Sequence, residues 1–179
     1  MRVIAFSCVH LMTLETAIGV YEYEGELDYE PFHKLCLIIQ QDPPDVVVNL
    51  GDFTEPFYEK PQRCVVWEAT MELLKEKVQF IKVAGNHDRE DGVDNVVLDG
   101  LRYEHGHKLS SEQAPGADGS VEGYIKALRA NTLGERLVHG HTHVPYLGPP
   151  DLLPLDVGSV TFSSTYGVIE NGVPLLQYL

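Results

Sequence analysis

Cysteine, basic residues and long apolar runs are all scarce in this sequence of 179 residues, and each shortage excludes a class of protein. The cysteines Cys8, Cys36 and Cys64 are scattered and form no CxxC pair, so they cannot build a disulfide framework and indicate a reducing compartment. No apolar run approaches the ~20 residues of a membrane-spanning helix, and residues 1–9 make a poor secretion signal. We therefore expect a cytoplasmic protein that makes no use of a membrane.

Positive charge is also in short supply: 13 Lys and Arg face 27 Asp and Glu, which gives a formal net charge of -14. Such a chain repels polyphosphate backbones, so we expect no extended nucleic-acid surface. Apolar types make up 44% and charged types 22% of the residues, which is ordinary for a folded protein. The length suits a single domain covering residues 1–179, and it neither requires nor forbids an oligomer.

Apolar periodicity in the first half of the chain predicts strands that alternate with helices, the arrangement that gives parallel strands. In the second half, Asp99-Gly100 and Asn171-Gly172 each separate two short apolar segments and predict hairpins. An acidic loop of residues 11–28 follows the first strand. The predicted strands are Val3–Phe6, Val46–Val48, Val78–Val83, Val96–Leu98, Leu101–Glu104, Arg136–Val138, Tyr166–Glu170 and Val173–Tyr178. The predicted helices are Tyr29–Gln41, Gln62–Lys77 and Val121–Ala130. These patterns predict a mixed α/β fold.

Histidine is the abundant residue that matters, because seven of the eight histidines fall in short clusters after predicted strands. Open α/β sheets bind ligands at the carboxyl ends of their strands, and imidazole, carboxylate, amide and thiolate groups all bind divalent transition metals. The segment His141-Thr142-His143 is informative because alternate residues of an extended segment point the same way and can share a metal. His33 lies alone on a helix and receives no role.

In chain order the clusters are Cys8-Val9-His10, Gly51-Asp52, Gly85-Asn86-His87-Asp88, His105-Gly106-His107 and Gly140-His141-Thr142-His143. Their order over residues 1–160 resembles that of the calcineurin-like metallophosphoesterases. The compact length and the His-Gly-His motif are most similar to the small phosphodiesterase branch, which also contains the retromer subunit Vps29. The resemblance implies a two-sheet β-sandwich of mixed strands flanked by helices, with two divalent metal ions, Mn, Zn or Fe, between the strand ends.

The resemblance also implies roles for single residues. The implied ligands of one metal are position 8, His10, Asp52 and His143, and those of the other are Asp52, Asn86, His105 and His141. His87 would donate a proton to the leaving oxygen and Asp88 would orient its ring. Asn86 would also bind the substrate, by neutralising charge on its phosphoryl oxygens. Apart from the resemblance, Arg89 directly follows Asp88 in the sequence and would reach a substrate phosphate, although an exposed, ion-paired arginine is the ordinary alternative. His107 and His139 have no counterpart among the family's metal ligands. They would either contact the ligands without binding metal or simply end a strand.

Cys8 departs from the family pattern, which carries Asp at this position. A thiolate is softer than a carboxylate and would alter the metal preference, whereas a packed thiol would leave the first site weak. The function implied by the resemblance is metal-dependent hydrolysis of a small phosphate ester, a phosphodiester rather than a monoester. The alternative is a catalytically silent, Vps29-like protein-binding scaffold. The loop of residues 11–28 would be either a lid over the metals or a solvated acidic loop.

Overall fold

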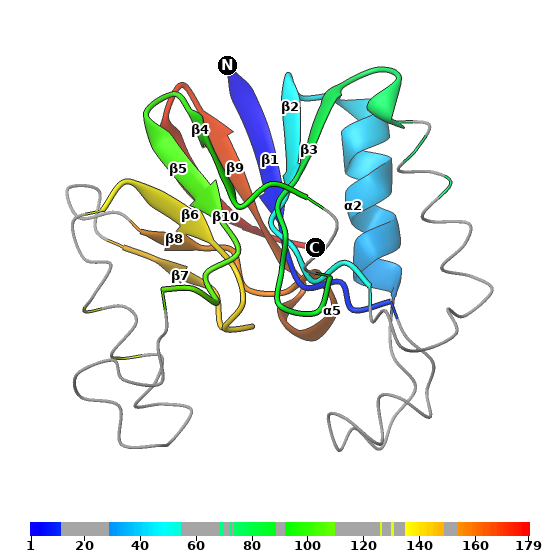
Figure 1. Cartoon of the computed structure of the whole chain (residues 1–179). Coiled ribbons are helices and arrows are strands. Elements are labelled where there is room, and N and C mark those ends of the chain that lie inside the picture. The colour runs from blue at the N-terminus through cyan, green and yellow to red at the C-terminus, as the bar shows by residue number, and fades with distance from the viewer. Residues whose placement is uncertain are drawn as a thin grey trace.

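The computed structural model describes residues 1–11, 29–54, 69, 72, 74–88, 92–109, 126, 130, 135–148 and 154–179. These residues form two five-stranded sheets, which Figure 1 shows facing each other. The first sheet has the order β10 (Val173–Tyr178), β9 (Thr165–Glu170), β1 (Arg2–Phe6), β2 (Val46–Asn49) and β3 (Gln79–Lys82). The second sheet has the order β4 (Asn95–Leu98), β5 (Leu101–Glu104), β6 (Leu137–His139), β8 (Leu155–Asp156) and β7 (Tyr146–Leu147).

The central strand β1 explains why the sheets and the helix form layers. It pairs in parallel with β2, and β2 pairs in parallel with β3. Its side chains alternate between the two faces of the sheet. Val3 and Ala5 belong to the apolar cluster shared with the second sheet, whereas Ile4 and Phe6 belong to the cluster shared with α2 (Glu30–Gln41). One strand therefore supplies both halves of the core, and its carboxyl end lies beside that of β2.

Helix α2 covers the outer face of the first sheet (Figure 1). Pro31 occupies its first turn, where no intrahelical N–H bond is lost, and Phe32, Leu35 and Ile39 are fully buried at helical spacing. Each such buried side chain stabilises the fold by about 1.5–3 kcal/mol. The helix ends at Gln41, before Pro43 and Pro44.

Most of the predicted elements are confirmed, with ends that move by a residue or two. Both hairpins have the left-handed turn residues that their sequences indicate, with φ of 48° and 72° at Asp99 and Gly100. The short elements β7, β8 and α5 (Val160–Ser163) escaped prediction. Positions 69, 72, 74 and 75 of the predicted helix Gln62–Lys77 are helical, as are positions 126 and 130 of Val121–Ala130, and most of the rest of both helices lies outside the described residues. Residues 12–28 of the acidic loop also lie outside them.

Within the described ranges, we find no helix whose length and apolar character would let it span a membrane.

Candidate metal centre

The side chains singled out in the sequence meet at the carboxyl ends of β1, β2, β3, β5 and β6. Backbone hydrogen bonds join the loops that carry them: the Cys8 and His10 N–H groups donate to the carbonyls of Gly51 and Asp52, both at 3.0 Å. The Gly140 N–H donates to the carbonyl of His105 at 3.0 Å. Segments far apart in the sequence are therefore held together by their main chains before any side chain is considered.

The candidate ligands have unusual backbone conformations. Of the eight non-glycine residues with positive φ in the described part of the chain, five are candidate ligands: Cys8, His10, Asp52, His141 and His143, with φ between 49° and 74°. A left-handed residue costs about 1–2 kcal/mol relative to a right-handed one, so a fold retains it only where the surroundings over-determine it. The concentration of this conformation at the strand ends is typical of a functional site.

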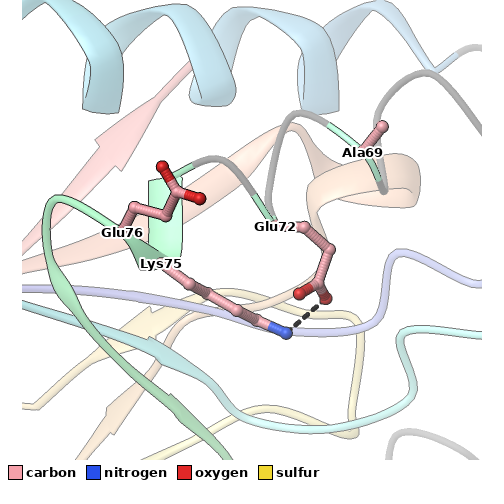
Figure 2. A pocket seen from close by; sticks show the side chains of 4 residues that line it. All are labelled: Ala69, Glu72, Lys75 and Glu76. Atoms are coloured by element: carbon pink, nitrogen blue, oxygen red, sulfur yellow. Dashed lines mark hydrogen bonds and ion pairs between the residues drawn. The ribbon is translucent and has the colours of Figure 1, made fainter.

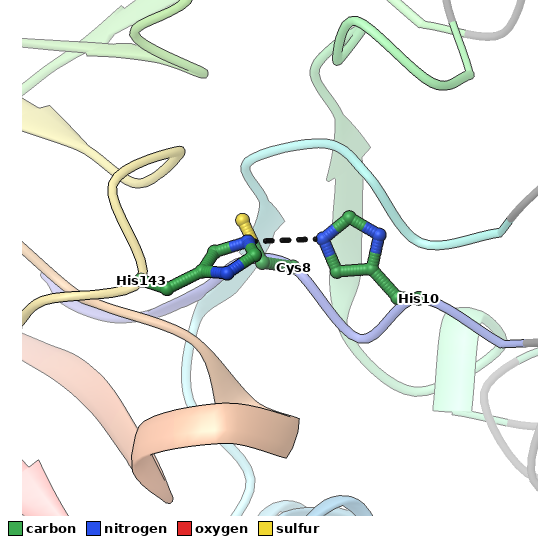
Figure 3. Close-up of side chains that lie close together, drawn as sticks. All are labelled: Cys8, His10 and His143. Atoms are coloured by element: carbon green, nitrogen blue, oxygen red, sulfur yellow. Dashed lines mark hydrogen bonds between the residues drawn. The ribbon is translucent and has the colours of Figure 1, made fainter. Parts of the chain in front are cut away.

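One group of donors contains Cys8, His10 and His143, whose ligand atoms lie within 4.8 Å of one another. Figure 3 shows the two imidazoles beside the sulfur, with one Nε2 facing the other; His10 Nε2 and His143 Nε2 are 3.1 Å apart. Two nitrogen donors on one metal ion, each at about 2.1 Å, lie about 3.0–3.4 Å apart. The spacing of these rings therefore fits a shared divalent ion. Phe162 of α5 stacks on the His143 ring, with 4.9 Å between the ring centroids, and fixes the plane of the His143 ring.

A second group of donors surrounds His105, which is buried. Its Nδ1 lies 2.7 Å from the Leu50 carbonyl, an acceptor, so Nδ1 carries the proton and Nε2 faces the site. Nε2 then lies 3.0 Å from Asp52 Oδ2, 3.0 Å from Asn86 Oδ1 and 3.2 Å from His141 Nδ1. These atoms converge on Nε2, where either a second proton on the ring or a cation in its place neutralises their repulsion. The donor set therefore fits a divalent metal ion.

Asp52 lies between the two groups. Its Oδ2 is 3.0 Å from His105 Nε2 and 4.0 Å from His10 Nε2, while its Oδ1 accepts the backbone N–H of His87 at 2.9 Å. Burial raises the pKa of this carboxyl, but the hydrogen bond and charge of His105, with the charge of His10, outweigh burial and hold the pKa well below its usual range. Asp52 therefore stays ionised.

The imidazoles of His141 and His143 are poor bases in this site. Burial, together with the neighbouring His105, lowers the pKa of His141 to about 3. Burial and His10 lower the pKa of His143 to about 3. Both rings are thus neutral near pH 7 and present a lone pair without competition from protons, which is the state a metal ligand needs.

The structure corrects one expectation about His141 and His143. Their segment is not extended, because φ is 74° at His141 and 60° at His143. The two rings separate as a result: His141 contacts His105, whereas His143 contacts His10. The pair serves two different groups of donors instead of one.

The loop after β3 contributes Asn86, His87 and Asp88. The His87 ring lies beside His10, with 5.1 Å between ring centroids, and its ligand atom is within 4.8 Å of those of His10 and Asp52. Asp88 was expected to orient the His87 ring, but its carboxylate has other neighbours. It accepts the backbone N–H groups of Asp52, Phe53 and Gly85 at 2.9–3.0 Å and pairs with Lys82 Nζ at 3.2 Å. Asp88 thus ties together the loops that follow β2 and β3.

Two structural supports escaped the sequence reasoning. The first is α5 with its N-cap: Ser159 Oγ donates to the Cys8 carbonyl, the Val160 N–H to the Ser7 carbonyl and Thr161 Oγ1 to the Val9 carbonyl, at 2.6–3.1 Å. These donors satisfy the carbonyls of residues 7–9, which follow β1 and take no part in the regular hydrogen bonding of the sheet. The sequence signal was the Ser159 cap, which is weak before so short a helix.

The second support is the buried Asp156 on β8. Its Oδ1 accepts the Gly158 N–H at 2.9 Å, and its Oδ2 accepts the Thr142 hydroxyl and lies 3.7 Å from His139 Nδ1. Thr142 separates His141 from His143, so Asp156 holds the loop that carries both rings. A two-residue strand has no readable period, which is why this carboxylate could not be found from the sequence.

Other candidates lie at the margin or outside the described residues. His107, 5.3 Å from His105 between ring centroids, lines a cavity of about 80 Å³ together with Asp94, Glu104 and Lys108. Arg89 lies outside the described residues. Figure 2 shows a larger hollow, of about 680 Å³, lined by the exposed residues Ala69, Glu72, Lys75 and Glu76, in which Lys75 pairs with Glu72. This hollow contains none of the converging donors, so size does not identify the site here.

Both the sequence and the fold are similar to those of known proteins. The model of the calcineurin-like phosphoesterase superfamily domain matches residues 1–171. Yfce, a phosphoesterase from E. coli, has 20% sequence identity and a TM-score of 0.55, over 96% of this chain and 89% of that one. An archaeal phosphodiesterase has 16% identity and a TM-score of 0.50 over 100% of both chains. Vps29 of Chaetomium thermophilum has 13% identity and a TM-score of 0.51, over 95% of this chain and 80% of that one.

No curated protein sequence matches this chain. At these low identities the solved structures show a similarity of fold alone. That fold is the expected two-sheet α/β architecture, which is thereby confirmed.

Proposed function

The chain belongs to the calcineurin-like phosphoesterase superfamily, and from that premise we propose that it hydrolyses a small phosphate ester at a centre of two divalent metal ions. A phosphodiester is the favoured substrate, because the small relatives of similar fold include an archaeal phosphodiesterase. When bound, such a pair of ions activates water and neutralises charge on the phosphoryl group.

The position of Asp52 is the observation that carries this proposal. A single oxygen, Oδ2, lies 3.0 Å from the imidazole of one donor group and 4.0 Å from that of the other. A carboxylate shared between two cations is how such centres keep their metals ~3.5–4 Å apart. One ion would be held by Cys8, His10, Asp52 and His143, and the other by Asp52, Asn86, His105 and His141.

His87 is proposed to protonate the leaving oxygen. Its ring stands beside His10, and its main chain is fixed by the hydrogen bond to Asp52, so the acid is held at the edge of the centre. Asp88 acts as a positioning residue through the backbone groups that it accepts. Asn86 and Arg89 are proposed to contact the substrate phosphate.

A protein-binding scaffold of the Vps29 kind is the second candidate, and the similarity of fold to Vps29 favours it. A scaffold has no use for a proton donor beside the donor cluster, so His87 weighs against it. The two candidates differ in a measurable way, because only the enzyme turns over a phosphate ester.

The test is an assay of purified, metal-stripped protein with bis-p-nitrophenyl phosphate and p-nitrophenyl phosphate, with Mn²⁺, Zn²⁺, Fe²⁺ or no metal. We expect metal-dependent turnover, faster with the diester. His87→Ala should lower kcat about 10²–10⁴-fold, the usual contribution of a positioned acid. The matched control is His33→Ala on α2, which should keep full activity. The His33 ring pairs with Glu30 at 3.5 Å and belongs to none of the donor groups among the described residues. Absence of turnover with every metal, or full activity in His87→Ala, would reject the mechanism.

A further inference from the structure

The sulfur of Cys8 lies among donors from both halves of the centre. It shares one set with His10 and His143 and another with Asp52 and His105, and within each set all ligand atoms are within 4.8 Å of one another. Figure 3 shows the sulfur beside the two facing imidazoles. Two independent donor sets meet at this one atom.

The surroundings hold Cys8 in place as they hold the other candidate ligands. Its φ is 56°, its N–H donates to the Gly51 carbonyl at 3.0 Å, and its carbonyl accepts Ser159 Oγ at 2.7 Å. Ser7 Oγ lies 2.9 Å from the sulfur. Either group can donate while the thiol keeps its proton, but only the hydroxyl can donate to a thiolate, so Ser7 would remain bonded to a ligating sulfur.

Cys36 shows what a packed thiol in this protein looks like. It is 1% exposed on α2 and belongs to the apolar cluster between that helix and the first sheet. Cys8 is equally buried, yet its sulfur faces imidazoles, a carboxylate and a hydroxyl. Burial is the same and the chemistry of the neighbours differs, which favours a role as a ligand over simple packing for Cys8.

We propose that the Cys8 sulfur ligates metal and makes this centre select thiophilic divalent ions, namely Zn²⁺, Cd²⁺ or Co²⁺, over Mn²⁺ and Mg²⁺. The inference rests on the proposed metal centre and names the ion that it takes. On binding, the S–H bond breaks, its electron pair forms the bond to the ion, and the proton leaves to solvent. A thiolate carries the same charge as a carboxylate but is softer, so metal preference changes while the charge of the donor set does not.

The experiment compares wild-type protein with Cys8→Asp, which keeps the charge, and with Cys36→Ser, which removes a thiol of equal burial from the apolar cluster. Metal-stripped samples receive Co²⁺, and absorption is recorded in the visible region and in the near ultraviolet, where thiolate-to-cobalt charge transfer appears. The same samples are then dialysed against equal Zn²⁺ and Mn²⁺, and the bound metals are counted by mass spectrometry.

We expect the charge-transfer band in wild type and Cys36→Ser and its loss in Cys8→Asp, which should still bind Co²⁺. The ratio of bound zinc to manganese should fall about tenfold or more in Cys8→Asp, the scale on which single groups change metal affinity. A wild-type protein that binds Co²⁺ without this band, that binds no Co²⁺, or whose zinc-to-manganese ratio matches that of Cys8→Asp would overturn the inference. Diester turnover on the same samples separates the two proposals: a band without turnover refutes the function alone, and turnover without a band refutes the role of Cys8 alone.

Discussion

Gly85→Ala should destroy the proposed centre without replacing any of its ligands. A Cβ at this position would lie 2.1 Å from Asp52 Oδ1 and 2.4 Å from the Asp52 backbone nitrogen. Because real Cβ contacts stay above 3.0 Å, the carboxylate must retreat by about 0.9 Å. Metal–ligand distances tolerate only about 0.2 Å, so Asp52 can no longer serve both donor groups. We expect metal affinity to fall at least about 10–100-fold.

The same substitution also overpacks the loop, which costs typically about 1–3 kcal/mol of unfolding free energy. Gly100→Ala is the matched control, because its new Cβ finds no atom nearer than 4.0 Å while its φ of +72° makes alanine strained by about 1–2 kcal/mol. Both variants should therefore be destabilised in thermal or urea unfolding, but only Gly85→Ala should lose metal in calorimetric titration with Zn²⁺. Undiminished zinc affinity in Gly85→Ala would refute the argument that Asp52 is held in place by the absence of a side chain there.

Two further outcomes follow from buried groups near the centre. Because burial lowers the pKa of His141 and His143 to about 3 in the folded state, the unfolded chain binds more protons below the ordinary value of 6.5. As the pH falls from 6.5 toward 3, metal-free protein should thus lose up to about 1.4 kcal/mol of unfolding free energy for each ring and each pH unit. Urea unfolding above and below pH 6.5 measures this loss. A double variant, His141→Asn with His143→Asn, whose unfolding free energy falls just as steeply with falling pH would contradict the prediction. Asp156→Ala leaves the buried Gly158 N–H without its acceptor, at about 1–3 kcal/mol. It also removes one of the two acceptors of the half-buried Thr142 hydroxyl, which then keeps only the Val144 carbonyl at 3.2 Å. Asp156→Asn keeps one acceptor and should recover most of the stability and zinc affinity; equal behaviour of the two variants would show that the acceptor is unimportant.

The part of the fold that could be predicted from the sequence is the part with a strong period. All residues of β2 and all but the first of β1 are buried, and α2 buries one face. The boundaries of these elements follow from Pro31, Pro43 and the apolar runs. The two hairpins follow from Asp-Gly and Asn-Gly, whose φ values suit the turn. β7 and β8 have two residues each, too few to show alternation, and they pair with each other across residues 148–154 instead of through a tight two-residue turn.

The candidate site could be predicted as a set of residues but not as a geometry. His10, Asp52 and His105 were found because polar groups follow apolar strands. His141 pairs with His105, and His143 with His10, because both have left-handed backbone conformations. The residue types at these positions do not predict those conformations. Glycine visits this region readily, and Asn, Asp and His are enriched in it, but even histidine adopts it only uncommonly. His141 and His143 therefore adopt it because the loops around them over-determine their conformation.

The net charge of -14 and an anionic substrate are compatible, because charge acts locally in a buried site. The lowered pKa of Asp52 keeps that carboxylate ionised, while the pKa values near 3 keep His141 and His143 neutral. In the proposed centre, one carboxylate and one thiolate would therefore face two divalent ions, which leaves the donor set and its metals positive. Screening limits the reach of the exposed carboxylates to about 8–10 Å in physiological salt, whereas metals in the proposed centre would act on a phosphate in contact with them. The acidic surface thus disfavours long polyanions, whose charges extend beyond the centre, and is compatible with the small phosphate ester proposed as substrate.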